Sequence, residues 1–114
     1  MNFKMRKAKV YFSRACLPAG REFAGIIEEL EKNKRYRFVY DRGYSNDPIS
    51  LTMPIKKREY IFEEFPPFFD GLLPEGVMLE GLIRRLKIDS NDLFGQLMAV
   101  GHDMVGAVTV EAII

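Results

Sequence analysis

Residues 65–86 constrain the fold of this chain more than any other segment, because aromatic, turn and helix signals are packed together there. Large apolar side chains crowd the start of the segment: Phe65, Phe68, Phe69, Leu72 and Leu73. Proline and glycine interrupt the same stretch: Pro66, Pro67, Gly71, Pro74 and Gly76. Proline lacks the N–H that a helix interior needs, so one long helix cannot form. The pattern predicts two short helical pieces joined at a kink.

The second helical piece has an amphipathic pattern. Leu79, Leu82, Ile83 and Leu86 recur at intervals of three and four residues, which is the spacing of one buried helix face. The simplest interpretation is that this segment belongs to the hydrophobic core. The alternative is that some of the aromatic side chains before it face a partner protein, and the sequence leaves both interpretations open.

Length and composition predict one soluble domain over residues 1–114. The chain is 47% hydrophobic and long enough to bury a core. Its one cysteine, Cys16, excludes an internal disulfide and indicates a reducing compartment. Arg14 interrupts the only candidate for a secretory signal, and no apolar run approaches the ~18 residues of a membrane span. We therefore expect a cytoplasmic protein.

Charge is divided sharply along the chain, although the net charge is only +1. Residues 1–58 carry 14 Lys and Arg against 6 Asp and Glu, and residues 59–114 carry 3 against 10. A basic half can attract nucleic acid or an acidic protein face. The two halves can also fold against each other and neutralise. Because the basic residues form short clusters rather than one stripe, direct DNA binding is the less favoured interpretation.

The first half of the chain contains two clear strand signals. Residues 8–13 are β-branched and aromatic, and residues 36–40 alternate aromatic and polar side chains. A turn is expected at 18–20. Residues 23–30 are ambiguous: local propensity favours a helix, while Gly25 and two isoleucines tolerate a strand.

The remainder of the chain is expected to alternate loops with short elements. Residues 41–48 have the composition of a loop, 49–53 that of a short strand, and 56–60 that of a charged connection. Capping side chains at 89–92 precede an apolar stretch that Gly101 terminates, which predicts a helix. Residues 105–110 form the last expected strand. The predicted class is α+β, with a mostly antiparallel sheet, two to three helices and a C-terminal strand that returns to the sheet.

The sequence offers no convincing catalytic or metal site. His102 and Cys16 are single and far apart, so they provide no metal-ligand spacing, and His102 is interpreted as a turn residue beside Asp103. No serine or cysteine stands next to a candidate base. Gly101 and Gly106 have the spacing of a phosphate loop, but the Lys-Ser/Thr continuation is missing. We expect no enzymatic activity, no cofactor and no metal.

Several motifs nevertheless resemble one protein family. The order ISLTMPI, PPFFDGLLPEG, GLIRRLKI and NDLFGQLMAVGHDMVGAVTV is similar to the N-terminal subdomain of HipA-like serine/threonine kinase toxins. The residues that carry the resemblance are Phe68, Phe69, Asp70, Leu72, Leu73, Pro74, Gly101, Asp103, Val105, Gly106, Ala107 and Val108. The resemblance covers nearly the whole chain. It implies that 23–30 is a strand paired with 35–40, against local propensity.

The resemblance also implies a function in binding rather than catalysis. In the family, the nucleotide loop, catalytic aspartates and phosphorylated serine lie in segments that would follow Ile114. A free-standing copy of the subdomain is similar to HipS, the antitoxin of HipBST systems, whose partner is the shortened kinase HipT and whose DNA-binding member is HipB. The implied partner is a HipT-like kinase, with a HipB-like helix-turn-helix protein as a further member of a larger complex.

This resemblance implies a contact surface with an aromatic centre and a charged rim. We expect the anchors among Phe62, Phe65, Phe68 and Phe69, and the rim charges at Lys56, Lys57 and Arg58. Two other functions remain open. The domain can be a structural part of a fused HipA-like kinase, or a small DNA-binding accessory protein that uses its basic half.

Overall fold

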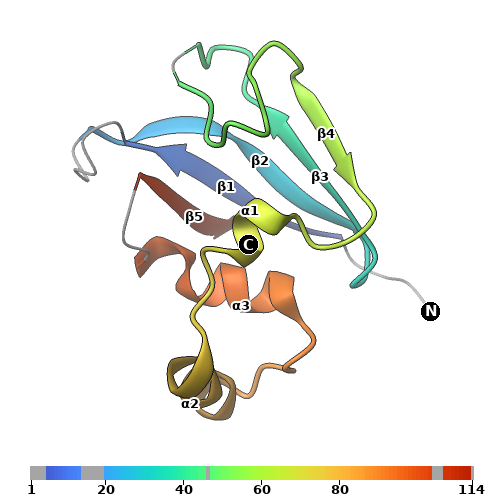
Figure 1. Cartoon of the computed structure of the whole chain (residues 1–114), viewed down its shortest axis with the longest axis vertical. Coiled ribbons are helices and arrows are strands. Elements are labelled where there is room, and N and C mark those ends of the chain that lie inside the picture. The colour runs from blue at the N-terminus through green and yellow to red at the C-terminus, as the bar shows by residue number, and fades with distance from the viewer. Residues whose placement is uncertain (1–4, 14–19, 46, 104–106, 114) are drawn as a thin grey trace.

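A computed structural model describes residues 5–13, 20–45, 47–103 and 107–113 of the chain. Along the sequence the elements are β1 (Arg6–Phe12), β2 (Glu22–Glu31), β3 (Arg35–Tyr40), β4 (Glu59–Phe62), α1 (Pro67–Asp70), α2 (Gly76–Leu86), α3 (Leu93–Val100), the 3-10 helix η2 (Gly101–Asp103) and β5 (Val108–Ile113). Figure 1 shows the strands forming one layer, with the helices on one side of it. The expected α+β class is confirmed.

The strands form one antiparallel sheet in the order β4-β3-β2-β1-β5. The last strand of the chain therefore returns to pair with the first, as expected. Alternate residues point to opposite faces of a strand. In β1, Ala8 and Val10 are buried, while Lys7 and Lys9 are exposed. The sheet consequently has one apolar face toward the helices and one charged face away from them.

Residues 23–30 lie within β2, which confirms the strand that the family resemblance implied. β2 pairs with β1 on one side and with β3 on the other. Gly25 fits this crowded position because it has no side chain: a Cβ there would lie 2.2 Å from the carbonyl oxygen of Val39. Neighbouring strands thus override the local helix propensity.

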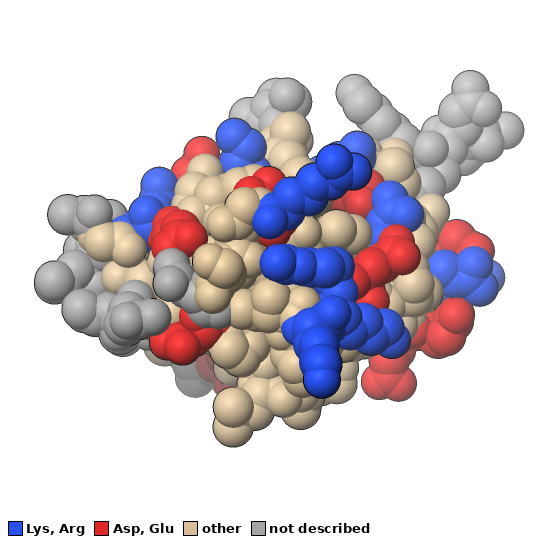
Figure 2. Space-filling model, turned by 90° about the horizontal axis from the view of Figure 1, so that it is seen from above, with Lys and Arg blue, Asp and Glu red and all other residues tan. Residues whose placement is uncertain are grey.

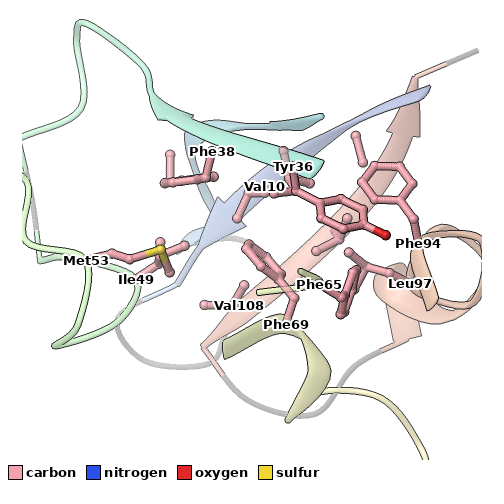
Figure 3. Packing of buried hydrophobic residues seen from close by; sticks show 14 of the residues in the cluster. Val10, Tyr36, Phe38, Ile49, Met53, Phe65, Phe69, Phe94, Leu97 and Val108 are labelled. Atoms are coloured by element: carbon pink, nitrogen blue, oxygen red, sulfur yellow. The ribbon is translucent and has the colours of Figure 1, made fainter. Parts of the chain in front are cut away.

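One hydrophobic core lies between the sheet and the helices. Its largest fully buried side chains include Tyr36, Tyr40, Tyr44, Phe38, Phe69 and Phe94. Figure 3 shows these layers meeting: Phe65 and Phe69 come from the α1 segment, Phe94 and Leu97 from α3, and Tyr36 and Phe38 from β3. The close approach of Gly101 to β5, where a Cβ would lie 2.5 Å from the Val110 carbonyl oxygen, lets α3 pack tightly on the sheet.

The expected helices are present. Two pieces, α1 and α2, occupy segment 65–86, and α3 begins at the N-cap Asp92, whose side chain accepts a hydrogen bond from the Gly95 N–H. Gly101 caps α3, and the chain continues directly into η2. The predicted buried face of α2 is only partly buried, because Leu82 is buried whereas Leu86 is 46% exposed.

Three sequence expectations about strands need correction. Residues 49–53 are not a strand: the Met53 N–H donates to the Ser50 carbonyl, and the Ser50 hydroxyl accepts from the Thr52 N–H, so local bonds fold the segment into turns. The connection expected at 56–60 ends in the edge strand β4. The final strand spans Val108–Ile113 rather than 105–110. Most of the turn expected at 18–20, and positions 105 and 106, lie outside the described residues.

Candidate protein-protein interface

A shallow groove opens where β4, the 50–53 turn and the start of α1 meet. It has a volume of about 390 Å³ and is lined by Thr52, Met53, Phe62, Glu64, Pro66, Pro67 and Phe68. Most of the lining is apolar. Two of the expected contact residues, Phe62 and Phe68, therefore meet at one surface depression although they are separated by the Glu63–Pro67 connection.

Phe65 and Phe69 belong to the hydrophobic core and do not line this groove. Phe69 is fully buried and its ring lies 6.1 Å from the ring of Phe38 in β3. Phe65 is 8% exposed and meets Tyr36 edge to face at 5.4 Å. Burial in the core removes both side chains from the set that a partner can contact. Their role is to hold α1 against the sheet, which fixes the position of the groove.

Phe62 and Phe68 are half-buried, so each keeps one side in the core and presents another to the groove. The Phe62 ring stacks near Tyr60 at 6.5 Å, and the Phe68 ring meets Phe69 edge to face at 5.2 Å. Aromatic side chains held in one orientation lose little further entropy when a partner covers them. Phe62 and Phe68 are thus the aromatic contacts that the structure leaves available at this site.

The loop that forms one wall of the groove is anchored by Tyr40. The Tyr40 hydroxyl donates a hydrogen bond to the Met53 carbonyl and accepts one from the Ile49 N–H at 3.1 Å. Tyr40 and Tyr44 stack in parallel with ring centres 5.8 Å apart. Burial raises the pKa of the Tyr40 hydroxyl above its ordinary value, so this group stays protonated and available as a donor. The loop wall is therefore part of the folded core.

Leu51 is a contact candidate that sequence reasoning missed. It sits at the tip of the 50–53 turn, beside the groove residues Thr52 and Met53, and is 93% exposed. The sequence suggested a short strand, in which Leu51 would have faced one side of a sheet. Because the segment is instead a turn, its side chain projects into solvent next to the groove.

The three basic residues expected at the rim are exposed but differ in their surroundings. Lys57 lies over the Tyr60 ring, with Nζ 5.1 Å from the ring centre. Arg58 donates a hydrogen bond from Nη1 to the Tyr44 carbonyl at 2.7 Å, so it fastens the loop as well as carrying charge. Lys56 and Lys57 are exposed, and neither is among the residues that line the groove.

The charge division of the sequence is neutralised in part by folding. Arginines of the first half pair with acidic residues of the second: Arg6 with Asp92, Arg21 with Glu111, Arg35 with Glu63, and Arg37 with Glu59. Figure 2 shows the molecule from the sheet side, where several Lys and Arg side chains gather near the middle of the face with Asp and Glu beside them.

The described residues also form a depression of about 420 Å³ on β2 and β3, lined by Phe23, Gly25, Ile26, Glu28, Val39, Tyr40, Asp41 and Arg42. They contain no group of three or more His, Cys, Asp and Glu side chains placed to hold a metal ion. His102 lies in η2 and is exposed. No helix in the described part of the chain is both long and apolar enough to cross a membrane.

Comparison with known proteins identifies the family. The sequence model of the HipA N-terminal domain matches residues 18–111. This chain belongs to the HipA N-terminal domain family. A solved structure of the N-terminal domain of HipA toxin agrees over 100% of this chain and 98% of its own, with a TM-score of 0.70 and 26% sequence identity. The groove described above is thus a feature of a HipA N-terminal domain.

A relative of similar size occurs in Haemophilus influenzae. This uncharacterized protein is 31% identical over 90 residues, which are 79% of this chain and 83% of the relative. Because the match spans most of both chains, the relative contains little beyond a HipA N-terminal domain. The domain therefore also occurs in a short protein.

Proposed function

We propose that this chain is an antitoxin that binds a HipT-like or HipA-like serine/threonine kinase and inhibits it without a covalent step. Its membership in the HipA N-terminal domain family carries the proposal. The short Haemophilus influenzae relative supports it, because a HipA N-terminal domain of this size has no room for a kinase. On this proposal the chain acts in the cytoplasm as a binding protein, with no cofactor and no catalytic activity.

The groove supplies a suitable contact surface. Protein interfaces concentrate their binding energy in a few aromatic side chains at the centre, surrounded by a polar rim. On this proposal Phe62 and Phe68 of the groove form the centre of the contact, and the exposed Leu51, Lys56 and Lys57 lie at its margin. The kinase would present an apolar segment to the groove and acidic side chains to the two lysines.

Inhibition follows if the domain docks where the fused subdomain of a HipA-like kinase would sit. Occupying that position disturbs either the kinase active site or its closure around nucleotide. This mechanism needs binding energy alone. A HipB-like DNA-binding protein would join through the complex, so contact of this chain with DNA is indirect.

Calorimetric titration of this chain against a purified HipT-like or HipA-like kinase tests the proposal. We expect saturable binding near one-to-one, and about ten-fold or more weaker binding for Phe68→Ala, because truncating a central aromatic hot spot costs about 2 kcal/mol or more. Met78→Ala is the matched control, since Met78 is an apolar side chain that is 75% exposed on α2, outside the groove. Equal affinity of the two variants would remove the groove from the interface.

The alternatives give different results in the same experiments. Binding without loss of kinase activity would indicate a structural role, as in a fused kinase. Absence of kinase binding, together with DNA binding that weakens steeply with salt, would favour the accessory DNA-binding function.

A further inference from the structure

One edge of the sheet is open in the described part of the chain. β4 lies at the end of the strand order and pairs only with β3, whereas β5 at the other edge packs against α3 and η2. Edge strands are usually protected, because their free N–H and C=O groups can pair with another chain. β4 contains no proline or glycine, and its Ile61 is 49% exposed. This edge is therefore able to accept another strand.

The backbone of β4 offers its free groups at Glu59 and Ile61. The Tyr40 N–H donates to the Arg58 carbonyl at 2.9 Å, so Arg58 directs its backbone groups toward β3. Successive residues of a strand direct these groups to opposite edges. Glu59 and Ile61 consequently point their N–H and C=O groups outward, where an antiparallel neighbour would find them.

The charges that flank β4 have opposite signs at its two ends. Lys56 and Lys57 precede the strand, Glu63 and Glu64 follow it, and all four are exposed. No ion pair of Lys56 or Glu64 is found within the described residues, while Glu63 makes an exposed pair with Arg35 at 3.3 Å. An antiparallel copy of the same segment brings the lysines of each chain beside the glutamates of the other.

The geometry points to reversible self-association, in which β4 pairs antiparallel with β4 of a second copy about a two-fold axis at Tyr60. This register brings Lys56 and Lys57, in the turn before β4, toward Glu63 and Glu64, in the bend after β4, of the second copy. It also places Glu59 opposite Ile61 of the second copy. The outward N–H and C=O groups of these two residues then form the hydrogen bonds between the two edge strands. The result is one continuous sheet across both copies.

Charge selects this register over its neighbour. A two-fold axis perpendicular to the sheet keeps the apolar faces of both copies on the same side. The two β4 strands can therefore slide past each other only by two residues at a time, which moves the axis by one residue. Moving the axis to Ile61 would place Glu59 opposite Glu63, which is a like-charge pair. The axis at Tyr60 avoids that repulsion and uses both lysines.

The association is expected to be weak and sensitive to salt. β4 is only four residues long, and exposed ion pairs contribute little individually. The pairing also draws on Phe62 and Glu64, which line the groove proposed to bind a kinase. Self-association would therefore compete with partner binding, although its existence does not depend on the proposed function.

Sedimentation equilibrium of the full chain over a range of concentrations tests this inference. We expect a monomer–dimer equilibrium that weakens as salt is raised. Ile61→Pro should abolish it, because proline removes an outward N–H while leaving the bonds to β3. A dimer that survives in Ile61→Pro, or a chain that stays monomeric up to about millimolar concentration, where even a weak dimer forms, would overturn the inference.

Reversing the charges on either flank of β4 tests the proposed register more directly. Lys56→Glu/Lys57→Glu makes both flanks acidic, and Glu63→Lys/Glu64→Lys makes both flanks basic, so each variant alone should associate about ten-fold or more weakly. Their mixture should associate, because opposite flanks then meet. Arg84→Glu/Arg85→Glu, on exposed positions of α2, applies the same charge change elsewhere and should leave the dimer intact. A mixture that fails to associate would contradict the proposed register.

Discussion

The guanidinium of Arg6 and the carboxylate of Asp92 form a two-pronged ion pair that joins the first strand to the last helix. Arg6 donates from Nη1 to Oδ2 at 3.0 Å and from Nη2 to Oδ1 at 2.7 Å, and its Nε donates to the buried Glu29 at 2.8 Å. The same Asp92 carboxylate caps α3 by accepting from the Gly95 N–H. One side chain therefore both starts α3 and fastens it to the sheet.

This ion pair predicts a loss of stability in acid. The hydrogen bond from Arg6 holds the pKa of Asp92 below its ordinary value of 3.8. Since the folded-state pKa lies below the unfolded one, the pair stabilises the fold above the unfolded value, and this contribution is lost as pH falls through the folded-state pKa. The Asp92→Asn variant keeps the helix cap but loses the charge. On going from neutral pH to acid, the free energy of unfolding should therefore fall less for this variant than for the native chain.

At neutral pH, Asp92→Asn should lower the free energy of unfolding by about 1–3 kcal/mol, because hydrogen bonds to Arg6 lose their charge assistance. Urea unfolding at several pH values measures both effects. Asp89→Asn is the matched control, since the exposed Asp89 carboxylate bonds only locally, to the Asn91 N–H. Parallel pH profiles for the native chain and Asp92→Asn would contradict the role given to this pair.

Phe65 and Phe68 should separate stability from binding. Phe65 is buried against Tyr36, so Phe65→Ala should cost ~3–5 kcal/mol of stability through the cavity it leaves. Phe68 is half-buried at the groove, so Phe68→Ala should destabilise less and act mainly on partner binding. Thermal unfolding of the two variants measures the difference. Equal melting temperatures would show that Phe65 is not a core residue.

Two glycines should respond oppositely to alanine. Gly25→Ala places a Cβ 2.2 Å from the Val39 carbonyl oxygen, so the β2–β3 pairing must shift and stability should fall by about 1–3 kcal/mol. At Gly81, in the middle of α2, an added Cβ would meet no atom within 4 Å beyond its chain neighbours and the backbone of its own helix, so Gly81→Ala should stabilise by up to ~1 kcal/mol. Denaturant midpoints of both variants check the pair, and a stabilising Gly25→Ala would refute the close approach.

Tyr40→Phe removes one oxygen that holds the groove wall. The Met53 carbonyl loses its donor and the Ile49 N–H loses its acceptor, so stability should fall by about 1–3 kcal/mol. Amide hydrogen exchange should quicken at Ile49 in the variant and stay unchanged in the distant α3. Unaltered exchange at Ile49 would mean that the loop is held by other contacts.

Local sequence signals predicted the elements that depend on short-range chemistry. The prolines and glycines of segment 65–86 do divide it into α1 and α2, and Asp92 does cap α3. Strand β3 was likewise predicted from its local pattern of alternating aromatic side chains. In each case the determining groups lie within a few residues of one another.

The remaining features depend on contacts that are distant in sequence. β2 is a strand because β1 and β3 flank it, and the family resemblance supplied what its propensity did not. Residues 49–53 alternate as a strand would, yet Tyr40 and local hydroxyl bonds fold them into turns. All four candidate anchors, Phe62, Phe65, Phe68 and Phe69, are phenylalanines, so residue type does not tell the buried ones from the others. The packing of the α1 segment on β3 shows that Phe65 and Phe69 are the buried pair.

A phosphorylation assay of a HipT-like or HipA-like kinase, titrated with this chain, tests the central claim most directly. The account predicts that kinase activity falls to a low plateau near one equivalent of the native chain, and that Phe68→Ala shifts the titration to about ten-fold higher concentration or more while Met78→Ala does not. Full kinase activity in the presence of a saturating, demonstrably bound chain would contradict the antitoxin function.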